Sequence, residues 1–218
     1  MKILVISDLH KNKSAAEQCS SIATNENTDL IVVVGDISHN DFDEAISLLK
    51  LIAQNKEVFF VPGNMDSRKL LNWTEDKIRN IHCKVMRIDD NLSFLGIGGS
   101  TRTPFNTSLE FDEEEVMSML TETSKMLDVK RFILVSHCPP KNSIVDEINH
   151  GIHGGSVSIR KFVEKNSPLV NICGHIHEAK GIDKIGDTLI VNPGAVKDGH
   201  YAIIELNRVP KVILKSFY

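Results

Sequence analysis

The 218-residue sequence predicts a layered α/β domain in which strands alternate with helices. Short runs rich in Val, Ile, Leu and Phe recur along the chain, and stretches with helical spacing separate several of them. The first of these runs are almost continuously apolar, as expected for strands that are covered on both faces of a sheet. We therefore predict a mixed core sheet in a single domain, residues 1–218, since no linker or repeat marks off a second one.

Eight segments have the length and composition of strands. They are residues 2–6, 30–34, 57–61, 92–96, 131–136, 169–173, 188–191 and 201–206. Towards the C-terminus, strand-like runs meet at Gly186-Asp187 and at Arg208-Val209-Pro210 with hairpin spacing and no helix between them. This pattern predicts an antiparallel C-terminal edge beside the mixed core sheet.

Three segments have the apolar periodicity of amphipathic helices, namely residues 41–54, 111–127 and 156–164. The second contains an acidic run, residues 112–115, near its start. A helix N-terminus favours negative charge, so we interpret this run as helix chemistry and not as a site. The third follows Gly154-Gly155-Ser156, a typical helix start.

The composition excludes several classes of function. A formal charge of −4 gives no basic surplus for holding nucleic acid, so we expect no dedicated nucleic-acid-binding surface. The four cysteines are widely spaced and form no Cys-x-x-Cys pair, which favours reduced thiols. The first apolar run is too short for a signal-peptide core, and no stretch is long enough for a bilayer. We expect a cytoplasmic protein with no membrane partner, and the oligomeric state stays open.

Polar side chains of the types that bind metals follow five of the predicted strands. They are Asp8 and His10, Asp36, Asn64, His137, and His175 and His177. In α/β sheets the crevice at the carboxyl ends of the strands is where ligands bind, so these side chains should meet there. Carboxylate and amide oxygens with imidazole nitrogens suit divalent cations, and one carboxylate can bridge two of them. Seven such groups fit two metals.

Each of these signals is weak by itself. Asp8 would serve equally well as a turn or helix-cap residue, and Gly63-Asn64 alone is usually a turn. The five positions together, in this order and all at strand ends, favour a metal site. Glycine precedes three of the ligands, at Gly35, Gly63 and Gly174, where a side chain would crowd the cluster.

The same blocks resemble the motifs of the calcineurin-like metallophosphoesterase superfamily, in particular its small cap-less bacterial and archaeal members. The matching blocks are Asp8-Leu9-His10, Gly35-Asp36, Gly63-Asn64-Met65-Asp66, Ser136-His137-Cys138 and Gly174-His175-Ile176-His177. The resemblance implies a four-layer α/β/β/α sandwich with two mixed β-sheets. It also implies a first metal on Asp8, His10 and His177, a second on Asn64, His137 and His175, and Asp36 as the bridge.

On this basis we expect a dinuclear phosphoesterase that acts on a small phosphate ester. A hydroxide that bridges two cations would attack phosphorus in line, with Asp36, Asn64 and His137 in the catalytic centre. Without thiolate ligands the donor set favours Mn²⁺, with Fe, Ni, Co or Zn as alternatives. The rival functions are a phosphomonoesterase or protein phosphatase, a non-catalytic scaffold on the same fold, and a recombination-repair nuclease, for whose additional domains the chain leaves little room.

The sequence departs from the superfamily pattern at Met65, where most members have a histidine near the leaving group. A thioether cannot donate a proton, and Asp66 is left as an orienting partner without that histidine. Relatives that resemble this chain in lacking the histidine tend to favour phosphodiesters, so we expect a phosphodiesterase.

Three further positions are open at this stage. His153 precedes the N-terminus of the third predicted helix, which either receives a phosphate or carries a replacement acid, or else His153 is an ordinary loop histidine. Arg102 and Asn106 either border the substrate or lie in a solvated loop. His39 follows Asp36 closely and is expected at the outer rim of the site or in a helix cap.

Overall fold

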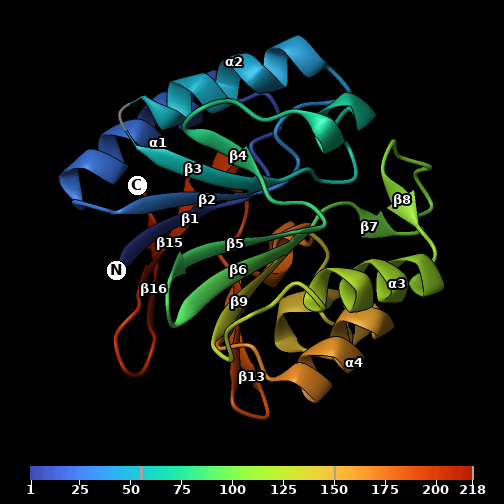
Figure 1. Cartoon of the computed structure of the whole chain (residues 1–218). Coiled ribbons are helices and arrows are strands. Elements are labelled where there is room, and N and C mark those ends of the chain that lie inside the picture. Colours follow the sequence, from blue (N-terminus) through green and yellow to red (C-terminus); the bar gives the residue numbers. More distant parts are fainter. Residues whose placement is uncertain (55, 150, 218) are drawn as a thin grey trace.

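Two six-stranded mixed sheets pack face to face between two pairs of helices (Figure 1) within residues 1–54, 56–149 and 151–217, which the computed structural model describes. The first sheet has the strand order β16-β15-β1-β2-β3-β4. Its strands are β1 (Lys2–Ile6), β2 (Leu30–Val34), β3 (Glu57–Val61), β4 (Ile78–Asn80), β15 (His200–Glu205) and β16 (Lys211–Ser216). Strands β1 to β4 are parallel, and β15 and β16 are antiparallel to their neighbours.

The second sheet has the strand order β13-β14-β12-β9-β6-β5. Its strands are β5 (Lys84–Asp89), β6 (Leu92–Ile97), β9 (Phe132–Ser136), β12 (Val170–Ile172), β13 (Gly181–Ile185) and β14 (Thr188–Asn192). The four central strands are parallel, and the two edge strands, β13 and β5, are antiparallel. Each sheet therefore has a parallel block whose carboxyl ends share one rim.

Helices cover the outer face of each sheet (Figure 1). The α-helices of the described residues are α1 (Lys13–Asn25), α2 (Phe42–Ala53), α3 (Glu113–Ser124) and α4 (Val157–Asn166). Short 3-10 turns, η1 (Arg68–Asn72), η2 (Ile144–Asp146), η3 (His177–Ala179) and η4 (Val196–Asp198), and two strand pairs, β7 (Ser100–Thr101) with β8 (Glu110–Phe111) and β10 (Glu147–Asn149) with β11 (Ile152–His153), complete the chain.

Alternation along the strands builds three apolar layers. In β1, Leu4 and Ile6 pack with α1 and α2, whereas Ile3 and Val5 face the second sheet. Phe59 and Phe94 meet across the two sheets with ring centroids 5.5 Å apart. The third layer lies between the second sheet and helices α3 and α4. Both sheets are thus covered on both faces, which explains their nearly continuous apolar sequences.

The structure confirms the α/β fold and the two-sheet sandwich, and it refines three expectations. Helix α3 occupies residues 113–124 and is shorter than the predicted segment. The two C-terminal hairpins do not form one edge, because β13 and β14 join the second sheet while β15 and β16 join the first. Helix α1, whose buried side chains are mostly small, was not predicted. No helix of the described residues has the length and apolar character needed to cross a membrane.

Candidate metal centre

The predicted ligands lie at the carboxyl ends of strands from both sheets. Asp8 and His10 follow β1, Asp36 follows β2 and Asn64 follows β3, all in the first sheet. His137 follows β9, and His175 and His177 follow β12, both in the second sheet. The loops are joined by backbone hydrogen bonds, including those from Asp8 N–H to the Gly35 carbonyl and from Gly174 N–H to the His137 carbonyl. The site therefore lies at the rim where the two sheets meet.

Several of these residues have a left-handed backbone. The φ angle is +58° at Asp8, +46° at His10, +49° at Asp36 and +69° at His175. This conformation is costly for residues with a side chain, and it persists only where surrounding contacts impose it. The clustering of such residues at one rim is typical of a functional site.

The glycines allow these loops to approach one another. A Cβ atom on Gly35 would lie 2.5 Å from His137 Nδ1, and one on Gly174 would lie 1.8 Å from Ser7 Oγ. A Cβ on Gly63 would lie 2.1 Å from Asp36 N. No side chain fits at such distances, so the expectation that these glycines prevent crowding of the cluster is confirmed.

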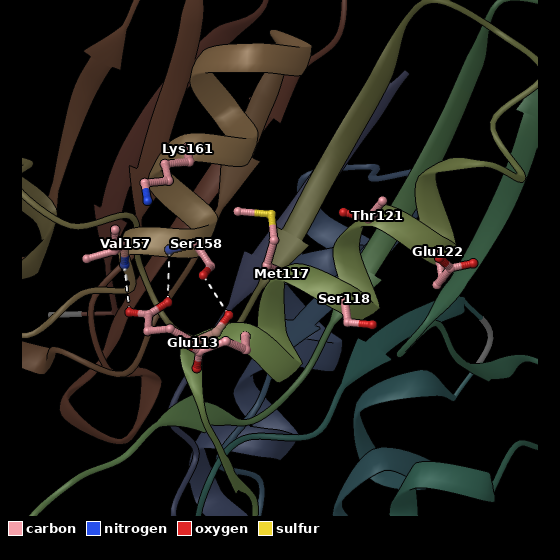
Figure 2. A pocket seen from close by; sticks show the side chains of 9 residues that line it. Glu113, Met117, Ser118, Thr121, Glu122, Val157, Ser158 and Lys161 are labelled. Atoms are coloured by element: carbon pink, nitrogen blue, oxygen red, sulfur yellow. Dashed lines mark hydrogen bonds between the residues drawn. The ribbon is translucent and has the colours of Figure 1, made fainter.

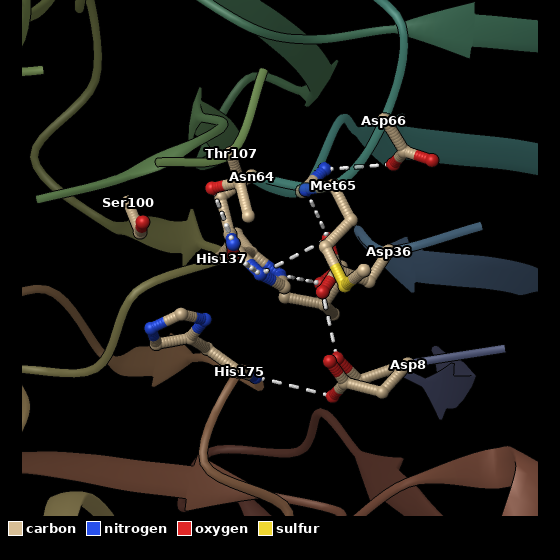
Figure 3. A network of polar contacts seen from close by, with 12 residues as sticks. Asp8, Asp36, Asn64, Met65, Asp66, Ser100, Thr107, His137 and His175 are labelled. Carbon is tan, nitrogen blue, oxygen red and sulfur yellow. Dashed lines mark hydrogen bonds and ion pairs between the residues drawn. The ribbon is translucent and has the colours of Figure 1, made fainter. Parts of the chain in front are cut away.

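The side chains form two groups of possible metal ligands, each with its donor atoms within 4.8 Å of one another. The first contains Asp8, His10 and His177, and the second contains Asp36, His137 and His175. In the first group, His10 Nε2 lies 3.0 Å from His177 Nε2, and His177 Nε2 lies 3.4 Å from Asp8 Oδ1. Figure 3 shows Asp8, Asp36, Asn64, His137 and His175 converging from separate loops.

Asp36 connects the two groups. Its Oδ2 lies 3.8 Å from His10 Nε2, and its Oδ1 lies 3.6 Å from His137 Nε2. Burial, followed by the nearby carboxylates of Asp8 and Asp66, raises the pKa of Asp36 well above its ordinary value. A carboxylate buried beside like charges is stabilised by cations that both of its oxygens can reach.

The second group is more deeply buried than the first, and Asn64 lies beside it. His137 is fully buried, and its Nδ1 lies 2.7 Å from the Val34 carbonyl, which can only accept a hydrogen bond. Burial lowers the pKa of His137, so the ring is neutral, with its proton on Nδ1 and a lone pair on Nε2. That lone pair faces Asn64 Oδ1 at 3.0 Å. Two acceptors that face each other are the arrangement expected of two ligands of one cation.

Other donors of the site also fit a cation. Asp8 is fully buried, and no well-aligned hydrogen-bond donor of the described residues reaches its Oδ1. Burial lowers the pKa of His175 to about 3 and that of His10 to about 4, so both rings keep a lone pair for a metal. Carboxylate and imidazole donors without thiolate suit a divalent cation of borderline hardness. The donor set thus fits two metal ions.

Two neighbours of the site have roles that the sequence showed only in part. Asp66 is fully buried and accepts hydrogen bonds from the backbone N–H groups of Ile37, Ser38 and Gly63. It therefore joins the loops that carry Asp36 and Asn64. His39 is exposed, and its Nε2 lies 2.9 Å from Nδ1 of His10. His39 lies at the rim, as expected, and in contact with a ligand.

The remaining candidates lie outside the two groups. His153 Nδ1 lies 2.7 Å from Oδ1 of the buried Asp146, and its side chain is 28% exposed. Its neighbour Gly154 packs close to Ile176, which separates His175 from His177. Arg102 forms an exposed ion pair with Asp112 at 2.8 Å. Together with Lys141, His153 and Arg102 line a cleft of about 510 Å³.

The acidic run at the start of α3 has more than one role. Asp112 and Glu115 form a capping box at the start of α3, as expected of helix chemistry. Glu113, however, accepts hydrogen bonds from the backbone N–H groups of Val157 and Ser158, which begin helix α4 (Figure 2). It lines a cleft of about 650 Å³ between the two helices. That cleft contains neither metal-ligand group. Glu113 therefore joins two helices and is not part of the candidate metal centre at the strand ends.

The fold and the site together define an α/β/β/α protein with two candidate metal-ligand groups at one rim. A model of the calcineurin-like phosphoesterase superfamily domain matches residues 1–208, and the chain belongs to this superfamily. The chain is 42% identical over 201 residues to an uncharacterised protein of Methanocaldococcus jannaschii, with 88% of each chain covered.

Solved structures share the fold at lower identity. A protein of Thermus thermophilus superposes with a TM-score of 0.77 at 18% identity, over 99% of this chain and 98% of the other. A dimetal phosphatase from Danio rerio superposes with a TM-score of 0.63 at 11% identity, over 100% of this chain and 99% of the other. At such identities the similarity shows the fold alone.

Proposed function

We propose that this protein is a dinuclear metal-dependent phosphoesterase that prefers small phosphodiesters and acts in the cytoplasm. The observation that carries the proposal is Asp36, whose two oxygens face separate histidine groups. In this assignment Asp8, His10 and His177 would hold one ion, Asn64, His137 and His175 would hold the other, and Asp36 would serve both. Mn²⁺ is the favoured metal, since the ligands are oxygen and nitrogen atoms.

When bound, two such ions supply Lewis-acid activation of water and neutralise the charge of a phosphoryl group. The chain holds its ligands ready for this role. The Val34 carbonyl fixes the His137 tautomer, and the Met65 N–H donates to Asp36 Oδ1 at 2.9 Å, which restrains the bridging carboxylate. Ligands held in this way need little reorganisation during the reaction.

The departing oxygen is the point at which the chain differs from most of its superfamily. Met65 has no proton to donate, so a poor leaving group needs another acid. We assign this role to His153, because the buried carboxylate of Asp146 lies at its Nδ1 and leaves Nε2 for a substrate. A diester with a good leaving group depends less on this proton than a monoester of an alcohol does.

The experiment is hydrolysis of bis(p-nitrophenyl) phosphate and p-nitrophenyl phosphate by metal-stripped protein, with and without added Mn²⁺. We expect Mn²⁺ to restore cleavage, faster on the diester, and Asp36→Asn to remove most of it. Faster cleavage of the monoester would favour a phosphomonoesterase. Absence of cleavage of both esters with Mn²⁺, Ni²⁺, Co²⁺, Zn²⁺ and Fe²⁺ would favour a non-catalytic scaffold.

A further inference from the structure

The loop between β7 and β8 is folded around one carboxylate. Glu110 is 8% exposed and accepts hydrogen bonds from the hydroxyls of Thr103 and Thr107, both at 2.6 Å. It also accepts from the backbone N–H groups of the same two threonines, at 3.2 and 2.8 Å. Burial raises the pKa of Glu110, but these hydrogen bonds outweigh burial and lower it to about 2. The group is therefore an ionised carboxylate that only accepts.

The carboxylate determines the direction of the next hydrogen bond. The hydroxyl proton of Thr107 is donated to Glu110, so Thr107 Oγ1 has only lone pairs left to offer. The atom of the Asn64 amide that lies 2.9 Å from Thr107 Oγ1 must therefore be the donor, Nδ2. The other atom of the amide, Oδ1, is then the one that faces His137 Nε2 at 3.0 Å. Figure 3 shows Thr107, Asn64 and His137 in this sequence.

The direction matters because an asparagine amide has two ends. If it were reversed, its NH₂ group would donate to the lone pair of His137 Nε2, and the pair would be satisfied without a cation. With the direction set by Glu110 and Thr107, two acceptors face each other, and a cation between them is favoured. A backbone hydrogen bond also holds this loop beside Asn64, since Leu109 N–H donates to the Asn64 carbonyl at 3.0 Å.

We infer that Thr107, fixed by Glu110, is a positioning residue that holds Asn64 with its oxygen towards the second metal. The inference rests on the proposed function, in which Asn64 is a ligand.

Thr103 offers a matched control. Its hydroxyl donates to the same carboxylate oxygen at the same 2.6 Å, but Asn64 has its side-chain contact with Thr107. Thr107→Val should weaken binding of the second Mn²⁺ by about 10- to 100-fold, as is typical when an outer partner of a ligand is removed. Thr103→Val should change the affinity for the second Mn²⁺ by less than about threefold, and Thr107→Ser, which keeps the hydroxyl, should bind it about as tightly as the wild type does.

The measurement is calorimetric titration of metal-stripped protein with Mn²⁺, with circular dichroism to establish that each variant is folded. If Thr107→Val does not fold, Glu110→Gln tests the same point. The Gln amide can donate a hydrogen bond to Thr107, so the Thr107 hydroxyl is free to donate to Asn64 and the Asn64 amide is free to reverse. Equal affinity of wild type and variant for both ions would overturn the inference alone. A wild-type protein that binds fewer than two ions would overturn the proposed function, and with it the role of Asn64.

Discussion

The candidate metal centre has a first half, formed by Asp8, His10 and His177, and a second half, formed by Asn64, His137 and His175. The two halves differ in how their ligands are held. In the second half, His137 is fully buried against a backbone carbonyl, and Asn64 is held by Thr107. In the first half, the side chain of His177 is 29% exposed, and His10 has the exposed His39 as its outer partner. Ligands held by buried partners lose less freedom on metal binding. We therefore expect the second half to bind its ion more tightly.

The largest effect should come from the residue that the two halves share. Asp36→Asn removes a charged bridge from both groups, so we expect turnover on bis(p-nitrophenyl) phosphate to fall by about 100-fold or more, beyond the loss typical of outer partners. His153→Ala should cost at least about tenfold less on this ester, because a nitrophenolate leaves without full protonation. Similar losses in the two variants would contradict the bridging role.

The next largest effect is a loss of Mn²⁺ affinity that differs between the two halves. His177→Ala should weaken the first ion and leave the second, whereas His175→Ala should weaken the second. Two-step Mn²⁺ titration of each metal-stripped variant measures this directly. The tighter step should survive in His177→Ala and disappear in His175→Ala. Loss of the same step in both variants would mean that the two halves are one site.

A smaller effect concerns the exposed partner of the first half. His39→Ala removes the group at Nδ1 of His10 and should weaken the first ion by about tenfold, the low end for an outer partner. His39→Asn keeps a side-chain acceptor and should retain part of the affinity. If neither substitution changes the weaker step of the Mn²⁺ titration, the contact between the two histidines has no role in metal binding.

A substitution at Met65 tests protonation of the leaving group and not metal binding. Met65→His restores a proton donor at the position where most of the superfamily has one, so in the His153→Ala background turnover should rise by several-fold on alkyl esters and less on nitrophenyl esters. The ratio of the two rates is the quantity to measure. The same ratio in His153→Ala with and without Met65→His would mean that another acid, and not His153, supplies the proton.

The smallest effect lies outside both halves. Burial, and then the charge of Lys84, lowers the pKa of His82 from 6.5 to about 4, and its Nδ1 accepts from Gly98 N–H. Between these values the unfolded chain binds a proton that the folded protein does not, so the free energy of unfolding falls as the pH falls from about 6.5 to about 4. His82→Asn should make this dependence shallower in urea titrations at pH 6.5 and 4.5. An unchanged slope would assign the effect to other groups.

Much of the fold follows from the sequence because buried parallel strands need apolar side chains at every position. The segments of β1, β2 and β3 were predicted with their observed bounds for this reason. Helix α1 was missed because it buries small residues such as Ala15, Ala16 and Ala23, which give a weak apolar stripe. The C-terminal hairpins were recognised, but turn residues do not determine which sheet a hairpin joins.

The site, like the fold, could be predicted from the sequence only in part. Ligand types at strand ends are visible in the sequence because the strands place them at one rim. The contacts that orient these ligands depend on loops that meet only in the folded chain. Glu110 and Thr107 are separated from Asn64 by more than 40 positions, and no local pattern marks either of them. The contact between His39 and His10 likewise becomes visible only when the ends of β1 and β2 are side by side.

The most direct test is an anomalous difference map from crystals of metal-stripped protein soaked in Mn²⁺. The account predicts two peaks that share Asp36, one against Asp8, His10 and His177 and the other against Asn64, His137 and His175. The second peak should appear at the lower Mn²⁺ concentration. A single peak, or peaks that do not contact Asp36, would contradict a dinuclear centre in this protein.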